Sequence, residues 1–271
     1  MKTKAKIRKT VGLALGSGAF RGFAHIGVLR SLIKHGIPID YLSGASIGAW
    51  AAAYYAAFGD TDRLEKDLAS HPVETLPMFF DFSLTGGFIG GAKINGFLEK
   101  GLGHKTFAKL KIPLRIAATE IVSGQPYVFS SGDVARAVRA SSSVPLVFKP
   151  LIQKGKIFVD GGLSNPVPCN LVRDMGADIV IGVNLYHKNE FVNRKFTMPQ
   201  VVLRSTRIVM HNLAKADIKH ADVAIEPDTS MIVKEQGLQK YFTKGVADEL
   251  IRMGEQATNK AIPKIKRLLA E

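Results

Sequence analysis

The chain has 271 residues, a formal net charge of +14, 46% hydrophobic residues and one cysteine. This hydrophobic content excludes a disordered chain, and a single cysteine excludes an internal disulfide and suits a reducing compartment. No apolar run reaches the roughly 18–20 residues that a membrane-spanning helix needs. We therefore expect a globular, cytoplasmic protein.

The positive charge includes a basic N-terminal segment, residues 1–9. The apolar stretch behind it is too short for a secretory signal peptide and runs into a glycine loop. A basic surface favours an anionic partner, nucleic acid or acidic membrane lipid, or simply keeps the protein in solution. The sequence has no zinc-ligand spacing, aromatic RNA-binding motif or basic recognition helix, so we expect no nucleic-acid partner.

Strand and helix patterns alternate along the chain. The run 10–15 predicts a strand, and residues 22–35 carry apolar side chains at helical spacing. A second strand is expected at 37–42, followed by an alanine-rich helix at 50–58. Further strands are expected at 112–119, 127–129, 156–159, 178–185 and 222–225, and further helices at 62–70, 133–140, 168–175, 200–219 and 244–261, the last interrupted by Pro263.

This alternation predicts an α/β fold, a three-layer sandwich in which helices cover both faces of a central, mainly parallel sheet. Residues 71–93 show neither pattern and are expected to be irregular. There is no internal repeat and no convincing linker. We expect one domain over residues 10–271, behind the basic segment 1–9.

Residues 44–48 have the sequence Gly-Ala-Ser-Ile-Gly and join a predicted strand to a predicted helix. At such a junction Ser46 would occupy a sharp turn, with its hydroxyl above the sheet and the first amides of the helix behind it. Gly44 and Gly48 would let the backbone turn without a Cβ clash. The pattern indicates a nucleophilic serine, although a helix start rich in small residues would have the same sequence.

A nucleophilic serine needs donors for the developing oxyanion. Residues 16–22 (GSGAFRG) link the first predicted strand and helix, where small residues expose backbone N–H groups at a helix N-terminus. A dinucleotide-binding loop would have G-x-G-x-x-G spacing, but Gly22 falls one residue late, and Phe20 and Arg21 would crowd a pyrophosphate. The loop favours an oxyanion hole, with a plain tight turn as the alternative.

The serine also needs a proton acceptor. Asp160 directly follows a predicted strand and precedes Gly161 and Gly162, which would let its carboxylate reach a neighbour; an ordinary turn aspartate would have the same context. A Ser-Asp-His triad is the alternative, although none of the late histidines has an informative context. These histidines are His187, His211 and His220.

Four short segments, in this order, together resemble the patatin-like phospholipase family. They are residues 16–22, residues 44–48, residues 139–145 (RASSSVP) and residues 160–162 (DGG). The resemblance covers roughly residues 10–185, and four blocks together are far more specific than any one of them. It includes the first helix, in which His25 is expected to be a packing residue.

The resemblance implies a Ser-Asp dyad in place of a triad. Ser46 would be the acyl-accepting nucleophile, and Asp160 would orient and deprotonate it. An aspartate of ordinary pKa is a weak base, so we expect burial to raise the pKa of Asp160. No metal or organic cofactor is required.

The resemblance also implies a role for the glycine-rich loop. The backbone amides of Gly16, Gly18 and Ala19 would form the oxyanion hole, and Arg21 would support this loop or bind an anionic head group. The implied activity is that of a serine hydrolase acting on fatty-acyl esters, such as a phospholipid or lysophospholipid. A regulatory protein that has kept the fold is the non-enzymatic alternative.

Within the irregular segment, residues 78–89 contain four phenylalanines among glycines. A flap over an acyl pocket would have this composition, and so would a loop packed on the core. If the segment is a flap, its aromatic side chains and the basic charge predict peripheral contact with an anionic membrane.

Overall fold

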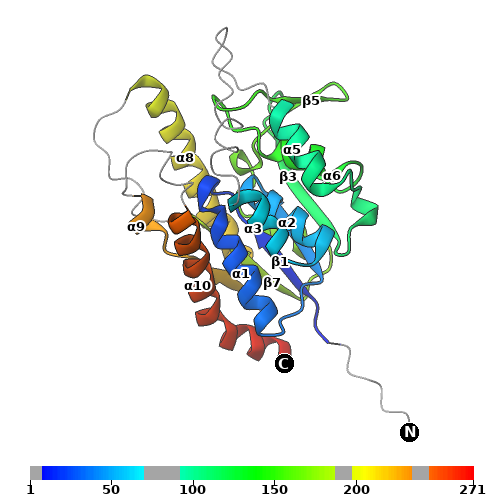
Figure 1. Ribbon diagram of the computed structural model, residues 1–271, viewed down its shortest axis with the longest axis vertical. Helices are drawn as coiled ribbons and strands as arrows, with labels where there is room; N and C mark the ends of the chain where they lie inside the picture. The colour runs from blue at the N-terminus through cyan, green and yellow to red at the C-terminus, as the bar shows by residue number, and fades with distance from the viewer. Residues whose placement is uncertain (1–7, 70–91, 187–196, 234–243) are drawn as a thin grey trace.

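The computed structural model describes residues 8–69, 92–186, 197–233 and 244–271. The strands are β1 (Val11–Leu15), β2 (Tyr41–Ala45), β3 (Leu114–Glu120), β4 (Pro126–Phe129), β5 (Leu151–Gln153), β6 (Lys156–Val159), β7 (Ile179–Val183) and β8 (Val223–Ile225). They form one sheet in the order β5-β6-β3-β2-β1-β7-β8, and β4 pairs with β3 (Figure 1). Adjacent strands in the series β3-β2-β1-β7-β8 run parallel. The pairs β4–β3, β6–β3 and β5–β6 are antiparallel.

Helices cover both faces of this sheet (Figure 1). They include α1 (Phe23–Lys34), α2 (Ile47–Phe58), α3 (Asp62–Ala69), α5 (Ala92–Leu102), α6 (Val134–Ser141), α7 (Cys169–Arg173), α8 (Met198–Asp217), α9 (Ser230–Val233) and α10 (Lys244–Ala270). Successive side chains of β1 point to opposite faces. Leu13 and Leu15 belong to the large core under α1, α2 and α10, whereas Ala14 packs in a smaller core with Val172 of α7 and Met210 of α8. This arrangement confirms the three-layer α/β/α prediction.

The second strand begins later than we predicted. The expected range was 37–42, but β2 starts at Tyr41. Gly36 has a φ of +66°, and the N–H of Ile37 donates to Leu32 O at 3.0 Å. Residues 36–37 therefore complete the C-terminal cap of α1, and the chain becomes a strand only after this cap.

The prediction that Pro263 interrupts the last helix is wrong, because α10 continues to Ala270. Ile262 and Ile265, on either side of the proline, are buried in the core. This packing outweighs the loss of one helical hydrogen bond.

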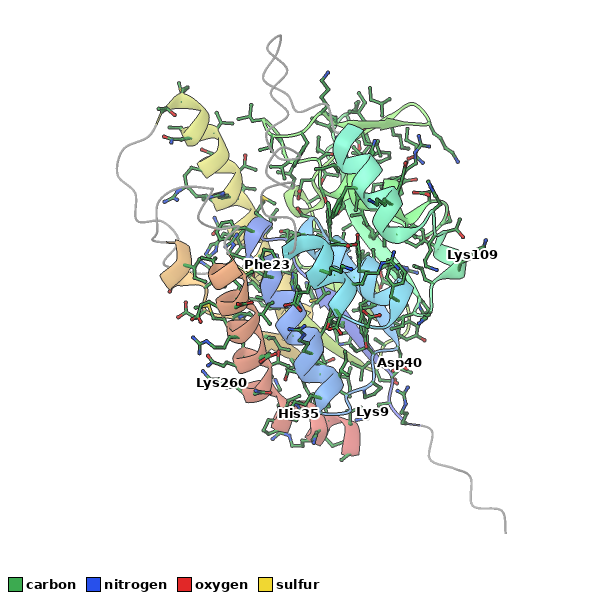
Figure 2. All side chains as sticks on the ribbon, viewed as in Figure 1. Lys9, Phe23, His35, Asp40, Lys109 and Lys260 are labelled. Atoms are coloured by element: carbon green, nitrogen blue, oxygen red, sulfur yellow. The ribbon has the colours of Figure 1, made fainter. Side chains whose placement is uncertain are left out.

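The C-terminal turn of α10 is also held by the start of the chain. Lys9, labelled in Figure 2, donates from Nζ to the carbonyl of Leu268, at 3.0 Å.

Helix α5 is a feature that the sequence analysis missed. Residues 92–93 belong to it, although we expected irregular structure there. The rest of that segment, 71–91 with the proposed flap, lies outside the described residues. Ile94, Leu98 and Leu102 recur every four residues and are buried. Two glycines within the helix hide this amphipathic pattern.

Three strands end at the same edge of the sheet. In open α/β folds, ligands bind at the edge formed by the carboxyl ends of the parallel strands. Parallel β1 and β2 end there at Leu15 and Ala45. Strand β6 runs the opposite way but overlaps β3 only at its tip, where Val159 pairs with Thr119. Asp160 therefore reaches the same edge as the residues that follow β1 and β2.

Of the basic segment expected at 1–9, the structure describes Arg8 and Lys9 alone. Arg8 forms an ion pair with Asp40, 2.6 Å between Nη2 and Oδ1. Asp40, labelled in Figure 2, also accepts the N–H of Val11 at 2.8 Å. These contacts fix the start of β1. The organisation of residues 10–271 as one domain stays a prediction.

Candidate active site

Ser46 occupies the sharp turn between β2 and α2. Its φ is +53°, a value that costs a non-glycine residue on the order of 1–3 kcal/mol. The backbone is crowded on both sides of the serine. A Cβ on Gly44 would strike the Gly48 carbonyl, and a Cβ on Gly48 would overlap the carbonyl oxygen of Leu15. The turn requires glycine at both positions.

Ser141 of α6 connects this turn to strand β3 through two hydrogen bonds. Its Oγ accepts the backbone N–H of Ser46 at 2.8 Å and donates to the carbonyl of Ala117 at 2.6 Å. Ser141 is fully buried. The hydroxyl therefore anchors the strained residue to β3. Sequence analysis placed Ser141 in a family block without assigning it a role, because its partner amide comes from a segment 95 residues away.

The Ser46 side chain contacts Asp160. Ser46 Oγ donates to Asp160 Oδ2 at 2.6 Å, and the other carboxylate oxygen, Oδ1, accepts the N–H of Gly162 at 2.7 Å. Asp160 is 0% exposed and Ser46 is 6% exposed. The structure thus joins the two residues in a buried pair, with the carboxylate oriented by Gly162.

The surroundings of Asp160 fix its backbone and change its acidity. Its N–H donates to Ser143 O at 3.0 Å, and its carbonyl accepts the Thr119 hydroxyl at 2.8 Å. Burial raises the pKa of the Asp160 carboxyl to about 6, although the hydrogen bonds from Ser46 and Gly162 act in the opposite direction. The carboxylate is therefore a stronger base than an exposed aspartate and is still mainly ionised at pH 7.

Gly161 and Gly162 let the chain turn closely after Asp160. A Cβ on Gly161 would overlap the carbonyl of Ala117, and a Cβ on Gly162 would lie 2.7 Å from Ser17 Oγ. Both glycines are buried in the short 3-10 helix that follows Asp160. They bring this helix against β3 and against the glycine-rich loop.

The glycine-rich loop corrects one of our expectations. The N–H of Gly16 donates to Val183 O at 3.0 Å, which extends the pairing of β1 with β7 beyond the end of the strand. The N–H of Ser17 likewise donates to Pro166 O at 2.8 Å. The Gly16 amide is thus occupied and is not available for an oxyanion. The carbonyl oxygen of Gly16 accepts a hydrogen bond from Nε2 of His25, at 2.7 Å.

The next two amides differ from that of Gly16. Within residues 8–69, 92–186, 197–233 and 244–271, the N–H groups of Gly18 and Ala19 make no hydrogen bond. Ala19 has a φ of +52° and begins a 3-10 helix that leads into α1. A Cβ on Gly22, at the end of this helix, would overlap the side chain of Ile47, which directly follows Ser46. Two unpaired amides therefore lie in a loop packed on the start of α2.

Arg21 supports this loop. The guanidinium is buried and donates from Nε to Gly18 O and from Nη1 to Leu185 O, both at 2.9 Å. It also lies over the ring of Tyr186, with Cζ 4.8 Å from the centroid. Of the two roles that we considered for Arg21, these contacts favour loop support.

Sequence analysis missed two side chains near the dyad, Tyr186 and Met210. Ser17 Oγ and the Tyr186 hydroxyl lie 3.0 Å apart in a buried hydrogen bond. Tyr186 is contributed by the segment after β7, and Met210 of α8 is close enough to Gly162 that a Cβ there would overlap its methyl group. No local motif signals Tyr186 or Met210, since they reach this site only when β7 and α8 pack beside β1.

None of the histidines in the described residues is hydrogen-bonded to Ser46 Oγ as a triad would require. In the described part of the chain, the hydrogen-bond partner of Ser46 Oγ is Asp160 and not a histidine. His211 is buried on α8 with its ring against Tyr186, and His220 lies exposed at the end of the following 3-10 helix. His187 lies outside the described residues. Burial lowers the pKa of His25 to about 4, so it is a neutral packing residue, as we expected.

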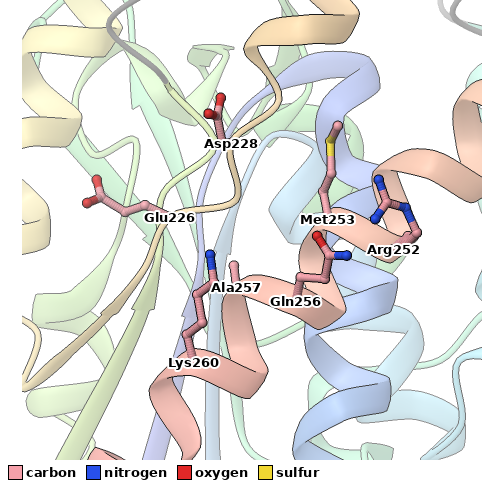
Figure 3. Close-up of a pocket in the computed structure, with 7 residues that line it drawn as sticks. All are labelled: Glu226, Asp228, Arg252, Met253, Gln256, Ala257 and Lys260. Carbon is pink, nitrogen blue, oxygen red and sulfur yellow. The ribbon is translucent and has the colours of Figure 1, made fainter.

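A separate concavity lies between the segment after β8 and α10 (Figure 3). Glu226 and Asp228 line one side, and Arg252, Gln256 and Lys260 line the other. Its charged lining does not include Ser46 or Asp160. Among the described residues there is no cluster of three His, Cys, Asp or Glu side chains that could hold a metal ion, and none of the described helices is long and apolar enough to cross a membrane.

Residues 13–173 match the family model described as Patatin-like phospholipase. This stretch is more than half of the chain and includes both Ser46 and Asp160. The chain belongs to the patatin-like phospholipase family. The four sequence blocks that we compared with this family all lie within the matched residues.

Several relatives of this patatin-like protein are similar over about two thirds of its length. It is 32% identical over 186 residues to an uncharacterised NTE family protein of Mycobacterium tuberculosis, 68% of this chain and 51% of the relative. It is 31% identical over 188 residues to human patatin-like phospholipase domain-containing protein 6, and 30% identical over 181 residues to lysophospholipase NTE1 of Pyricularia oryzae. These matches cover 67% and 65% of this chain, but 14% and 12% of the relatives. The match thus spans about half of the first relative and a small part of the others.

The fold is also similar to a solved structure. VipD from Legionella pneumophila superimposes with a TM-score of 0.63 at 14% sequence identity. The match covers 96% of this chain and 67% of VipD. At this identity the similarity concerns the fold, and it agrees with the mainly parallel sheet and flanking helices described above.

Proposed function

We propose that this patatin-like protein is a serine acyl hydrolase in which Ser46 and Asp160 form a catalytic dyad. The observation that carries the proposal is the 2.6 Å hydrogen bond from Ser46 Oγ to the buried Asp160 carboxylate. The serine occupies a strained turn at the carboxyl edge of the sheet, which is the position of the nucleophile in serine hydrolases of related architecture. Membership of the family supports the same reading.

In the first step, Asp160 Oδ2 takes the proton of Ser46 Oγ as the oxygen attacks the ester carbonyl carbon. The raised pKa of Asp160, about 6, brings the carboxylate closer to the pH at which a general base is efficient. The hydrogen bond from Gly162 holds Oδ1 and leaves Oδ2 for the proton. This orientation replaces the role that a third residue has in a triad.

The attack converts the carbonyl oxygen into an oxyanion, which needs preorganised donors. We assign the N–H groups of Gly18 and Ala19 to this role, because they are the loop amides without a partner among the described residues. Gly16 is left out, since its N–H is bonded to Val183. Arg21 positions the two donors by its hydrogen bond to the carbonyl of Gly18.

The tetrahedral intermediate then collapses. The alcohol leaves with the proton held by Asp160, and the acyl group stays on Ser46 Oγ. Water next attacks the acyl carbon while Asp160 takes its proton, and the release of the carboxylic acid returns the proton to Ser46. Each half of the cycle uses Asp160 once as base and once as acid.

The proposed substrate is a fatty-acyl ester, either a phospholipid or a lysophospholipid. Family membership supports a lipid, and one of the relatives is named a lysophospholipase. The cycle described above requires no metal ion or organic cofactor, because every proton and acyl transfer uses Ser46, Asp160 or backbone amides.

Covalent labelling tests this proposal directly. A fluorophosphonate probe forms a stable adduct with an activated serine, and peptide mapping identifies the modified residue. We expect one adduct on Ser46 in the native protein and none in Ser46→Ala. Ser17, also a buried serine at this edge, is the internal control and stays unmodified.

The two alternatives give different results. A Ser-Asp-His mechanism predicts labelling of Ser46 that survives Asp160→Asn and is lost when a late histidine is replaced. A regulatory protein without activity predicts no labelling of folded protein. Absence of the adduct from protein with an intact circular dichroism spectrum would overturn the proposal.

A further inference from the structure

Helix α8 has an apolar face that the rest of the described structure does not cover. The helix spans 20 residues, Met198–Asp217, and Figure 1 shows its N-terminal end projecting beyond the α/β body. Five large hydrophobic side chains on this helix are between 42% and 76% exposed. They are Met198, Val201, Val202, Ile208 and Val209.

These five residues form one stripe. The pairs 198/201, 198/202, 201/208 and 202/209 are three, four or seven positions apart, a spacing that places residues on the same side of an α-helix, and Ser205 lies among them. At 100° per residue, the stripe covers an arc of about 120°. Met210 and Ala214, which are buried against the sheet, lie on the opposite side. Helix α8 is therefore apolar on two opposite faces, of which one packs on the protein.

The charge of this helix restricts what the outer face can contact. The helix contains Arg204, Arg207 and Lys215, and its one acidic residue is Asp217 at the C-terminal end, which accepts the N–H of Val167. The whole chain carries a net charge of +14. A surface helix that combines an apolar stripe with basic residues is typical of binding to an anionic lipid interface. A second copy of this chain would bring the same basic helix against itself, where like charges repel.

We propose that the outer face of α8 docks on an anionic phospholipid bilayer. The valines, Ile208 and Met198 would enter the interfacial region, and the basic side chains would remain among the anionic head groups. The inference deepens the proposed function, on which its substrate argument rests, because Met210 on the inner face of the same helix packs at Gly162, two residues after Asp160. Docking through α8 would hold the dyad one helix diameter, roughly 10 Å, from the lipid surface.

Vesicle sedimentation tests the proposal on the full chain. The Ser46→Ala protein is used throughout, so that lipid hydrolysis does not change the vesicles. We expect it to bind vesicles of phosphatidylcholine with phosphatidylglycerol more tightly than vesicles of phosphatidylcholine alone, and to bind less tightly as salt is raised. Adding Val201→Ser, Val202→Ser and Val209→Ser should weaken binding about tenfold or more.

A second triple variant is the matched control. Ile121→Ser, Val122→Ser and Ile152→Ser remove three apolar side chains that are 51% to 78% exposed, two of them directly after β3 and one on β5. This control should bind vesicles as the parent does. Equal losses in both triples, or no loss in the α8 triple, would overturn the assignment. An α8 triple that breaks up an oligomer but keeps its vesicle affinity would show that a second copy covers the face.

A fluorescent reporter keeps the test independent of changes in folding. Trp50, the single tryptophan, is buried and gives a constant background. We expect the emission of Val202→Trp to shift to the blue on anionic vesicles and to be quenched by brominated lipid, whereas Ile152→Trp is unaffected. The same response from both reporters, or no response from Val202→Trp, contradicts docking through α8.

The outcomes separate this inference from the proposed function. Vesicle binding through α8 without fluorophosphonate labelling of Ser46 would sustain the docking surface and overturn the catalytic proposal. Labelling of Ser46 without vesicle binding would sustain the catalytic proposal and overturn the docking surface. The α8 triple in the Ser46 background should also hydrolyse a water-soluble short-chain ester as fast as the native protein, since none of its positions contacts the dyad.

Discussion

Ser46 Oγ lies 2.6 Å from Asp160 Oδ2, although 114 residues separate the two in sequence. Ser46 follows parallel strand β2, and Asp160 follows antiparallel strand β6, whose tip pairs with the end of β3. The two side chains thus meet from strands that run in opposite directions. The Gly162 N–H holds the second carboxylate oxygen, so both oxygens of Asp160 have a hydrogen-bond partner.

The pH dependence of the reaction should report the ionisation of Asp160. In the proposed mechanism, Asp160 can accept the Ser46 proton only when its carboxyl group is ionised. Burial raises the pKa of this carboxyl group to about 6. We expect kcat/KM to be constant above this pH and to fall about tenfold per pH unit below it. A histidine base would titrate in a similar range, but its midpoint shifts strongly with temperature, because imidazole ionisation has a large enthalpy. A profile still flat at pH 5, or a midpoint with that temperature dependence, would contradict the assignment to Asp160.

Ser141→Ala should lower turnover by releasing the Ser46 backbone. The variant loses the acceptor for the Ser46 N–H and the donor to Ala117 O. We expect kcat to fall about tenfold with little change in KM, and the free energy of unfolding to fall by about 1–3 kcal/mol. Steady-state kinetics and urea unfolding measure the two effects.

Ser43→Ala is the matched control for this variant. Ser43 is also fully buried and its hydroxyl donates one hydrogen bond, but to Pro168 O, which lies outside the turn at Ser46. It should lose stability without losing turnover. Equal kinetic losses in both variants would mean that Ser141 acts on stability and not on the geometry of the nucleophile.

Gly48→Ala should destabilise the fold strongly. The new Cβ would overlap the carbonyl of Leu15, a backbone atom that cannot move aside without displacing β1. We expect the free energy of unfolding to fall by roughly 3–5 kcal/mol. Gly96→Ala, on the exposed side of α5 with nothing near the added Cβ, should instead be stabilising by roughly 0.5–1 kcal/mol. Denaturant unfolding that gives the two variants the same stability would refute the crowding argument.

Arg21→Lys distinguishes loop support from binding of a head group. A lysine cannot donate along both directions that Arg21 uses toward Gly18 O and Leu185 O. We expect kcat to fall about tenfold on charged and uncharged esters alike, because the oxyanion donors are displaced. Arg30→Lys, at a half-buried ion pair between α1 and Glu65 of α3, should have no effect on kcat. A loss confined to esters with anionic head groups would favour the other role.

The features that sequence predicted well depend on local signals. The glycines around Ser46 and after Asp160 mark turns that only glycine fits, so both residues could be proposed as site residues. The strand and helix alternation likewise predicted the three layers. Boundaries failed where a local signal was misleading, as at Ile37, which caps α1, and at Pro263, which the packing of its neighbours overrides.

The remaining features depend on contacts between distant segments. The N–H of Gly16 is occupied because β7 pairs with β1, an arrangement that the sequence around Gly16 does not encode. Ser141 and Tyr186 reach the site only through tertiary packing. The outer face of α8 could not be separated from its inner face by periodicity, since both are apolar and only the packed structure covers one of them.

The most direct test of the dyad is a comparison of ester hydrolysis in matched variants. We expect Ser46→Ala to lose activity completely and Asp160→Asn to lose roughly 10²–10⁴-fold in kcat/KM, because the amide keeps the shape but cannot accept the proton. His187→Ala, His211→Ala and His220→Ala should stay within a few fold of the native protein. Activity that survives Asp160→Asn but disappears with one of these histidines would contradict the account.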